Sequence, residues 1–228
     1  KIYLNLIGKI QVTNILMAII AANNSGIEFK KILKILPRIT SVEGRLEKIG
    51  KIHNNSKVIL DYAHTPAALE SALSNLKEQF PSNKINLIFG CGGDRDFKKR
   101  SLMGKIAEKY SNEIYLTDDN PRNEKPFEIR NEIKKGIKNK RIHEIPDRKK
   151  AIREAVKNLK TGDILLVAGK GHEKIQDYGK KRTFFSDQKV ILSSIRAKNK
   201  FLSKNIKLNI IQEQSKLNLS KVPSEVSA

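Results

Sequence analysis

Tryptophan is absent from this sequence, and Cys91 is the only cysteine among its 228 residues. One cysteine cannot form an internal disulfide, which excludes a disulfide-stapled fold and is typical of a protein kept in a reducing cytosol. We expect Cys91 to pack as a small apolar residue. No apolar run approaches the roughly 20 residues that a membrane-spanning helix needs. The apolar stretch near the beginning is interrupted by Gln11 and Thr13 and lacks a cleavage pattern, so we expect a cytoplasmic protein without a secretory signal.

Acidic residues are also few. The sequence holds 24 Asp and Glu against 45 Lys and Arg, which gives a formal charge of +21. Such an excess indicates either a polyanionic partner or a composition that leans to Lys, Ile and Asn throughout. The lysines are scattered, and neither an arginine-rich stripe nor a series of stacking aromatics occurs, which favours the second interpretation. We therefore do not expect a nucleic-acid partner, and a basic polyanion-binding module remains the alternative from another functional class.

Short β-branched runs alternate with amphipathic helices from Lys57 onward. Strands are predicted at 58–63, 85–90, 113–118, 163–169 and 182–187. Helices are predicted near 12–22 and 28–36, after Thr65 and Asp147 as N-caps, around 102–110, and at 126–137 and 187–197. This alternation predicts an α/β fold, with a Rossmann-like, mostly parallel sheet covered by helices on both faces. Residues 198–228 are polar and weakly periodic, and we expect a disordered tail there.

Four polar clusters follow predicted strands. They are DYAHTP (61–66), GCGGDRD (90–96), DDNPR (118–122) and GKGHE (169–173). In open parallel sheets ligands bind at the carboxyl ends of the strands. The sequence therefore predicts one binding rim built from all four clusters.

The DDNPR cluster offers the groups that an amino acid needs. A zwitterion requires an acceptor for its ammonium and a cationic fork for its carboxylate, and Asp119 and Asn120 with Arg122 supply both. Pro121 stiffens the loop that presents them. The alternative is an ordinary Asx-Pro turn before a helix.

The other clusters add candidate ligand contacts. Arg95 follows a glycine-rich turn and suits a carboxylate or phosphate, although a surface arginine on a tight turn is the alternative. Gly169 lets a ligand approach the backbone, and Glu173 can accept from an ammonium. Asp61 and His64 suit a sugar hydroxyl or a nucleotide edge, or an ordinary helix start. Neither GxGxxG nor GxxxxGK(S/T) occurs, and no metal-ligand spacing or nucleophile–base pair does, so we assign no catalytic or metal residue.

In this order the four clusters resemble the Mur ligase family, and within it the members that add the third residue of the peptidoglycan stem peptide. The similarity is strong over about 43–195, where GRLE, DYAHTP, FGCGGDRD, KRSLMG, DDNPR and LVAGKGHE occur, and weaker at the beginning, where GKIQVTN resembles the end of the family's central ATPase domain. The resemblance implies that residues 1–42 are a remnant of that ATP-binding domain and that 43–197 form the family's C-terminal domain. The tail at 198–228 lies outside the family pattern.

The resemblance implies an ATP-dependent acid–amino-acid ligase that joins meso-2,6-diaminopimelate to UDP-N-acetylmuramoyl-L-alanyl-D-glutamate in peptidoglycan synthesis. In this family ATP phosphorylates the substrate carboxylate, the incoming amine attacks the acyl phosphate, and ADP and phosphate leave. The implied ATP contacts are Asn14, Arg45, Asp61 and His64. The implied diaminopimelate contacts are Arg95, Asp119, Asn120, Pro121, Arg122, Gly169 and Glu173.

Arg122 bears on the choice of amino acid. In the DNPR form of the motif the arginine pairs with the distal carboxylate of diaminopimelate, which lysine lacks. Arg122 therefore favours diaminopimelate, with a lysine-adding ligase as the alternative.

Two features depart from the family pattern. Gln11 stands where Asn is expected, and Ser101 where Pro is usual. The family's phosphate loop, Mg²⁺-binding groups and UDP-sugar domain lie upstream of the first residue. We therefore expect the Mg²⁺ ligands outside this chain, and a monomer that is inactive by itself.

Overall fold

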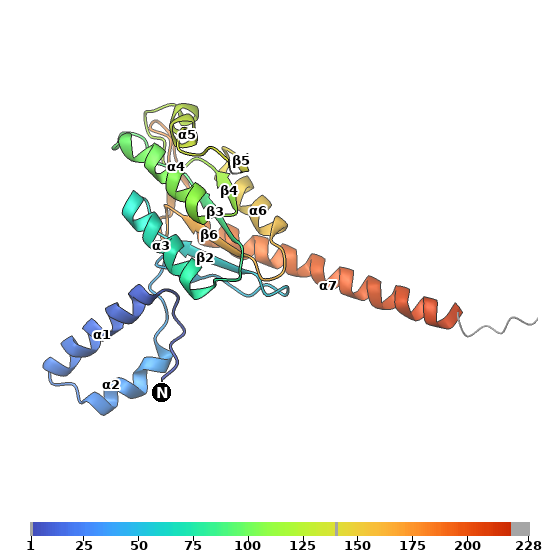
Figure 1. The fold of residues 1–228 in the computed structure, drawn as a ribbon, viewed down its shortest axis with the longest axis horizontal. Helices are drawn as coiled ribbons and strands as arrows, with labels where there is room; N and C mark the ends of the chain where they lie inside the picture. The colour runs from blue at the N-terminus through green and yellow to red at the C-terminus, as the bar shows by residue number, and fades with distance from the viewer. Residues whose placement is uncertain (1, 140, 220–228) are drawn as a thin grey trace, which may run out of the picture.

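A six-stranded sheet runs through the centre of the protein (Figure 1). The computed structural model describes residues 2–139 and 141–219, and side chains within these ranges through residue 208. The strand order is β1 (Glu47–Lys48), β2 (Lys57–Asp61), β6 (Ile164–Ala168), β3 (Ile85–Phe89), β4 (Glu113–Leu116) and β5 (Ile142–Glu144). Only β1 pairs antiparallel, and the other neighbours are parallel. The predicted α/β fold is confirmed.

Alternate side chains of the strands pack into two cores. Helices α3 (Pro66–Gln79), α4 (Lys98–Tyr110) and α5 (Pro126–Lys134) cover one face, and α6 (Arg148–Asn158) and α7 (Asp187–Leu219) cover the other. In β6, Leu166 faces the first core, whereas Leu165 and Val167 face the second. Because both faces are covered, the central strands are apolar along their whole length.

The two predicted N-caps are present. The Thr65 hydroxyl accepts a hydrogen bond from Ala68 N at 3.3 Å, and Asp147 Oδ1 accepts one from Lys150 N at 2.9 Å. Each cap satisfies a backbone donor in the first turn of its helix, α3 and α6 respectively. Local side chains therefore determine where these two helices begin at the end of the sheet that carries the polar clusters.

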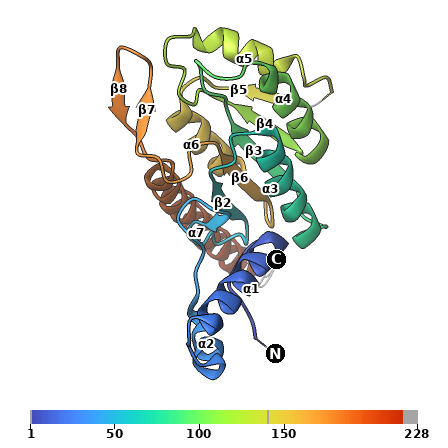
Figure 2. The same cartoon turned by 90° about the vertical axis from the view of Figure 1, so that its left-hand side faces the viewer.

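A small hairpin lies apart from the main sheet. It consists of β7 (Ile175–Asp177) and β8 (Arg182–Phe184), paired antiparallel, and Figure 2 shows it beside the end of the sheet. The strand predicted at 182–187 is β8, and it does not join the main sheet. Its partner β7 was not predicted, because three residues with a polar centre have no recognisable strand pattern. The edge strands β1 and β5 were also not predicted, because they are too short to show a strand pattern.

Helix α7 differs from the prediction. It was expected to end near residue 197, but it continues to Leu219, so 198–219 is helical and not a disordered tail. No Gly or Pro interrupts this stretch. Lys198 Nζ donates to the carbonyl oxygens of Lys157 and Leu159, each at 2.7 Å, and Asn199 Nδ2 donates to Lys51 O at 2.9 Å. These contacts hold its middle against the body, and residues 220–228 lie outside the described part.

Before the sheet the chain forms an arm. Helices α1 (Lys9–Asn24) and α2 (Phe29–Ile35) and the short 3₁₀ helix η1 (Leu36–Arg38) project from the body (Figure 2). Only Ile15 of α1 is buried, whereas Leu16, Met17 and Ile20 are each more than half exposed. No helix in the described ranges is long and apolar enough to cross a membrane.

Candidate functional site

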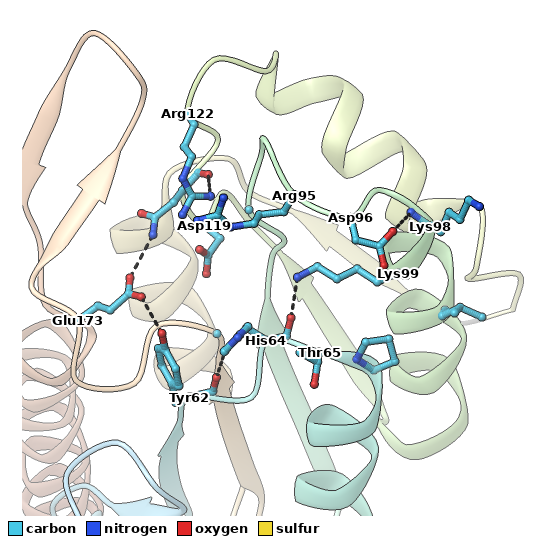
Figure 3. A pocket seen from close by; sticks show the side chains of 15 residues that line it. Tyr62, His64, Thr65, Arg95, Asp96, Lys98, Lys99, Asp119, Arg122 and Glu173 are labelled. Carbon is cyan, nitrogen blue, oxygen red and sulfur yellow. Dashed lines mark hydrogen bonds between the residues drawn. The ribbon is translucent and has the colours of Figure 1, made fainter.

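A cavity of about 600 Å³ opens at the carboxyl ends of β2, β3, β4 and β6. All four polar clusters contribute to its wall, as Figure 3 shows. The lining includes Tyr62, His64, Thr65, Gly92, Arg95, Asp119, Asn120, Arg122, Gly169 and Glu173. The structure thus brings the predicted rim together as one site.

Asp119 presents to this cavity a carboxylate whose Oδ2 atom accepts no hydrogen bond within the described ranges. Its side chain is buried, and no donor among the described residues reaches its Oδ2 atom. Burial raises the pKa of this carboxyl, which the charges of Arg148 and Lys170 oppose. Gly169 makes the close approach possible, because a Cβ there would lie 2.7 Å from Asp119 Oδ2. The site therefore holds a desolvated acceptor suited to an ammonium group.

Asn120 and Glu173 form a second polar group in the wall. Asn120 Nδ2 donates to Glu173 Oε2 at 3.1 Å, and Tyr62 Oη donates to Glu173 Oε1 at 3.3 Å (Figure 3). Burial alone would raise the pKa of Glu173, but hydrogen bonds from Lys170, Asn120 and Tyr62 hold it below its usual value. Glu173 is thus a carboxylate at neutral pH, next to Asp119.

Arg122 reaches the cavity from a strained loop. Its φ of +51° lies in the left-handed region that favours glycine. Its Nη1 atom donates to Gly93 O at 2.7 Å and to Asn120 O at 3.4 Å. Within the described chain no carboxylate accepts from this guanidinium, so its charge is available to a ligand. Pro121 is buried and does not line the cavity, and its ring restricts the backbone of the loop.

Arg95 occupies the loop after β3 and lines the cavity. Its Nη1 atom donates to Asp94 O at 3.0 Å, and the side chain is otherwise exposed. The loop is held by Arg100, which is almost fully buried and pairs with Glu124 at 2.8 Å. Cys91 is buried in the same region, and burial raises the pKa of its thiol to about 12, so it packs as the small apolar residue we expected.

Three of the expected nucleotide residues lie near Tyr62 or on the arm. His64 lines the cavity, and its ring packs edge-on against Tyr62 with centroids 4.6 Å apart. The Arg45 guanidinium lies 4.7 Å from the centroid of the same Tyr62 ring. Asn14 lies on α1, where its Nδ2 donates to Gln11 Oε1 at 3.4 Å. Gln11 Nε2 in turn donates to Arg45 O, which connects the arm to this aromatic group.

Asp61 is not among the residues that line the cavity. Its Oδ2 accepts from Leu46 N at 2.7 Å and its Oδ1 from Ala63 N at 2.8 Å. Burial raises the pKa of Asp61, and the two backbone donors oppose the rise. In this structure the carboxylate ties the segment before β1 to the end of β2.

We expect Asp61→Ala to lower the free energy of unfolding by about 1–3 kcal/mol, because two buried N–H groups lose their acceptor. Urea unfolding of the chain measures this loss, with Glu43→Ala, at an exposed carboxylate nearby, as the control. Equal stability of Asp61→Ala and the wild type would contradict the structural role.

One lysine and one arginine lie next to the site, although the sequence analysis did not single them out. Lys170 is fully buried and donates to Asn120 Oδ1 at 2.9 Å and to Glu173 Oε2 at 3.0 Å. Arg148 is also fully buried, and its Nη1 atom lies 4.0 Å from Asp119 Oδ2. The sequence signal for Lys170 was its position between two glycines after an apolar strand. No signal in the sequence around Arg148 distinguishes it from other arginines at the start of a helix.

Metal ligands are not gathered in this part of the protein. Among the described residues, no group of three or more His, Cys, Asp and Glu side chains is arranged to hold a metal ion. The expectation that Mg²⁺ is bound by an upstream segment is left untested by this observation.

Known proteins resemble the chain over most of its length. The model of the Mur ligase glutamate ligase domain matches residues 44–171. A UDP-N-acetylmuramoyl-L-alanyl-D-glutamate–2,6-diaminopimelate ligase from Rickettsia felis is 45% identical over 199 residues, which cover 86% of this chain and 37% of that protein. The ligase of the same name from Buchnera aphidicola subsp. Baizongia pistaciae is 47% identical over 195 residues, covering 85% and 38%.

A solved structure supports the same relationship. A UDP-N-acetylmuramoyl-L-alanyl-D-glutamate–2,6-diaminopimelate ligase superposes with a TM-score of 0.69 at 38% identity, over 86% of this chain and 40% of that one. The chain thus spans about two fifths of the length of the relatives it matches. Because the domain match covers more than half of the chain and the fold agrees, the chain belongs to the Mur ligase family.

Proposed function

We propose that this chain is the amino-acid-binding part of an ATP-dependent ligase that adds meso-2,6-diaminopimelate to UDP-N-acetylmuramoyl-L-alanyl-D-glutamate in peptidoglycan synthesis. The observation that carries the proposal is the cavity itself. It joins the Asp119 carboxylate, whose Oδ2 atom accepts no hydrogen bond in the described part of the chain, and the Glu173 carboxylate with the guanidinium groups of Arg95 and Arg122. The similarity to the 2,6-diaminopimelate ligases from Rickettsia felis and Buchnera aphidicola supports this substrate.

The proposed binding mode follows from the charges. Asp119 and Glu173 accept from the ammonium at one end of the ligand, while Asn120 and Arg122 hold the carboxylate at the same end. Gly169 leaves room for the approach, Pro121 stiffens the loop, and Arg95 adds a further cation at the rim. Diaminopimelate carries a second amine at its other end, which this arrangement leaves uncovered for attack on an acyl phosphate.

Arg122 supports diaminopimelate over lysine. A guanidinium without a carboxylate partner gains a charge-assisted pair from the distal carboxylate of diaminopimelate. Lysine would instead bring an ammonium with no carboxylate to the same place, which is unfavourable. The lysine-adding ligase is therefore the weaker candidate.

ATP and Mg²⁺ are proposed partners of the complete enzyme. We assign Asn14, Arg45, Asp61 and His64 as the nucleotide contacts of this chain, and Asp61 also holds Leu46 beside the end of β2. Mg²⁺, held by residues outside this chain, would neutralise the phosphates. The enzyme is proposed to act as a monomer in the cytoplasm.

We also propose a domain boundary near residue 42. The exposed apolar side chains of α1 are typical of a helix that packs against further parts of a domain. Residues 1–42 are accordingly proposed as the end of the central ATP-binding domain. Residues 43–197 are proposed as the C-terminal domain.

Direct binding tests the proposal. The 228-residue chain is titrated with meso-diaminopimelate and separately with L-lysine, followed by two-dimensional amide NMR. We expect diaminopimelate to bind at least about tenfold more tightly, with shifts centred on Asp119–Arg122 and Gly169–Glu173. Equal affinity for lysine would overturn the substrate assignment. Absence of binding by either amino acid would contradict an amino-acid site within this chain.

A further inference from the structure

Lys170 is a buried charge that the proposed binding mode does not use. It follows β6 between Gly169 and Gly171, and none of its side chain is exposed. It is not among the residues that line the cavity. A buried ammonium is costly unless it is paired and hydrogen-bonded, so its partners indicate its role. Those partners are Asn120 Oδ1 at 2.9 Å and Glu173 Oε2 at 3.0 Å, both in the amino-acid site.

Lys170 determines which way the Asn120 amide points. Asn120 Oδ1 accepts from Lys170 Nζ and also from the backbone N of Asp177 at 3.0 Å. A flipped amide would set its own NH₂ group against these two donors and its oxygen against the Glu173 carboxylate. The amide is therefore held with Nδ2 toward Glu173 Oε2, at 3.1 Å.

The same ammonium fixes Glu173. Its Oε2 atom accepts from Lys170 and Asn120, while its Oε1 atom accepts from Tyr62. The charged and titratable groups that face Glu173 are Tyr62, Asp119, Arg148 and Lys170. Lys170 is the cation that bonds to it directly, and it offsets the repulsion between the Glu173 and Asp119 carboxylates.

We propose that Lys170 is a positioning residue of the amino-acid site, which holds the Asn120 amide in one orientation and the Glu173 carboxylate in one place without touching the ligand. This inference rests on the proposed function, because it assumes that these two groups receive an amino acid. Side chains that are already positioned spare the ligand the entropy cost of ordering them on binding.

The hairpin holds the backbone of the DDNPR loop, so the effect of Lys170 on side chains can be measured apart from the folding of that loop. Gln176 Nε2 donates to Asp119 O at 2.9 Å and to Asp118 O at 3.3 Å, and Arg122 N donates to Asp177 O at 3.0 Å. These bonds hold the backbone of the DDNPR loop independently of Lys170. Loss of the ammonium should therefore disturb side-chain orientation more than the loop's path.

The test compares Lys170→Met with the wild-type chain, first without ligand. Carbon-13 NMR follows the titration of the Glu173 carboxyl, and proton–nitrogen NMR follows the side-chain amide of Asn120. We expect the pKa of Glu173 to rise, since its cation is lost, and the Asn120 NH₂ hydrogens to exchange faster with water. The affinity for meso-diaminopimelate should fall about tenfold to hundredfold, because ligand binding must then supply the free energy that orders the Asn120 and Glu173 side chains.

A double-mutant cycle distinguishes positioning from a general loss of structure. If Lys170 acts partly through Asn120, Lys170→Met should cost less affinity in an Asn120→Ala background than in the wild type. Lys77→Met, at an exposed lysine of α3, is the matched control and should change none of these measurements. If Lys170→Met does not give a native circular dichroism spectrum, Lys170→Gln is measured instead, and the same directions are required.

The outcomes separate the two proposals. If the wild type ignores diaminopimelate, the proposed function fails, yet the ligand-free titration of Glu173 still tests Lys170. If Lys170→Met leaves the pKa of Glu173, the exchange of the Asn120 amide and the affinity unchanged, the positioning role is wrong. Equal costs in both backgrounds of the cycle would overturn its action through Asn120.

Discussion

Arg148→Met is expected to lower the free energy of unfolding by about 3–5 kcal/mol, because it leaves the Asp187 carboxylate buried without its cation. Both side chains are fully buried. Arg148 Nε lies 2.8 Å from Asp187 Oδ1 and Nη2 lies 2.6 Å from Oδ2, so the pair is bidentate. Guanidinium-induced unfolding of the chain, followed by circular dichroism, measures the loss.

Two further variants test whether the loss of stability comes from the unpaired Asp187 carboxylate. Arg153→Met removes an exposed arginine from the same helix and should change stability by less than about 0.5 kcal/mol. In the double variant Arg148→Met/Asp187→Leu both charges of this pair are removed, so stability should be partly regained. A loss below about 1 kcal/mol for Arg148→Met would show that the pair behaves like an exposed ion pair and contradict the prediction.

The same pair joins the site to the rest of the fold. Arg148 Nη2 also donates to Ala168 O at 2.9 Å, immediately before Gly169. The start of α6, the start of α7 and the end of β6 thus meet at one guanidinium. Its Nη1 atom faces Asp119 from there.

Arg122→Ala is expected to weaken the binding of meso-diaminopimelate by about thirtyfold or more without lowering the affinity for L-lysine. Removing one partner of a hydrogen-bonded charge pair at a binding site costs about 2 kcal/mol or more, and lysine has no distal carboxylate to lose. Isothermal titration of the chain with each amino acid measures both affinities.

Arg122→Lys is the matched comparison. It keeps the charge but loses the planar fork, so its affinity for diaminopimelate should lie between those of the wild type and Arg122→Ala. Thermal unfolding of the variants shows whether the bond from Arg122 to Gly93 O also supports the loop. An equal loss of affinity for the two amino acids would refute the assignment of Arg122 to the distal carboxylate.

Local signals explain what the sequence predicted of the fold. Thr65 and Asp147 cap α3 and α6 through donors three residues away, so short patterns were sufficient. The four clusters could be assigned to one rim because parallel strands end at one edge. The end of α7 was misplaced because a polar sequence without Gly or Pro continues as a helix when a residue such as Lys198 finds a partner on α6, here Lys157 O.

Long-range partners explain what the sequence missed in the site. Lys170 is paired with Asn120, 50 residues away, and Arg148 with Asp187, 39 residues away. Neither partner is visible in the surrounding sequence. The nucleotide role of Asp61 stays a prediction, and only the structure reveals that its two oxygens also accept from Leu46 and Ala63.

The position of β6 also determines when the cavity can exist. β6 pairs with β2 on one side and with β3 on the other, although it follows both by more than 70 residues. On a chain synthesised from its N-terminus, β2 and β3 are complete long before the strand that separates them. Such non-local pairing is slow because loop-closure entropy is lost before contacts form. The strand that closes the sheet also delivers Gly169 and Glu173, so a partly folded chain has no preformed pocket, and ligand can stabilise only the completed fold.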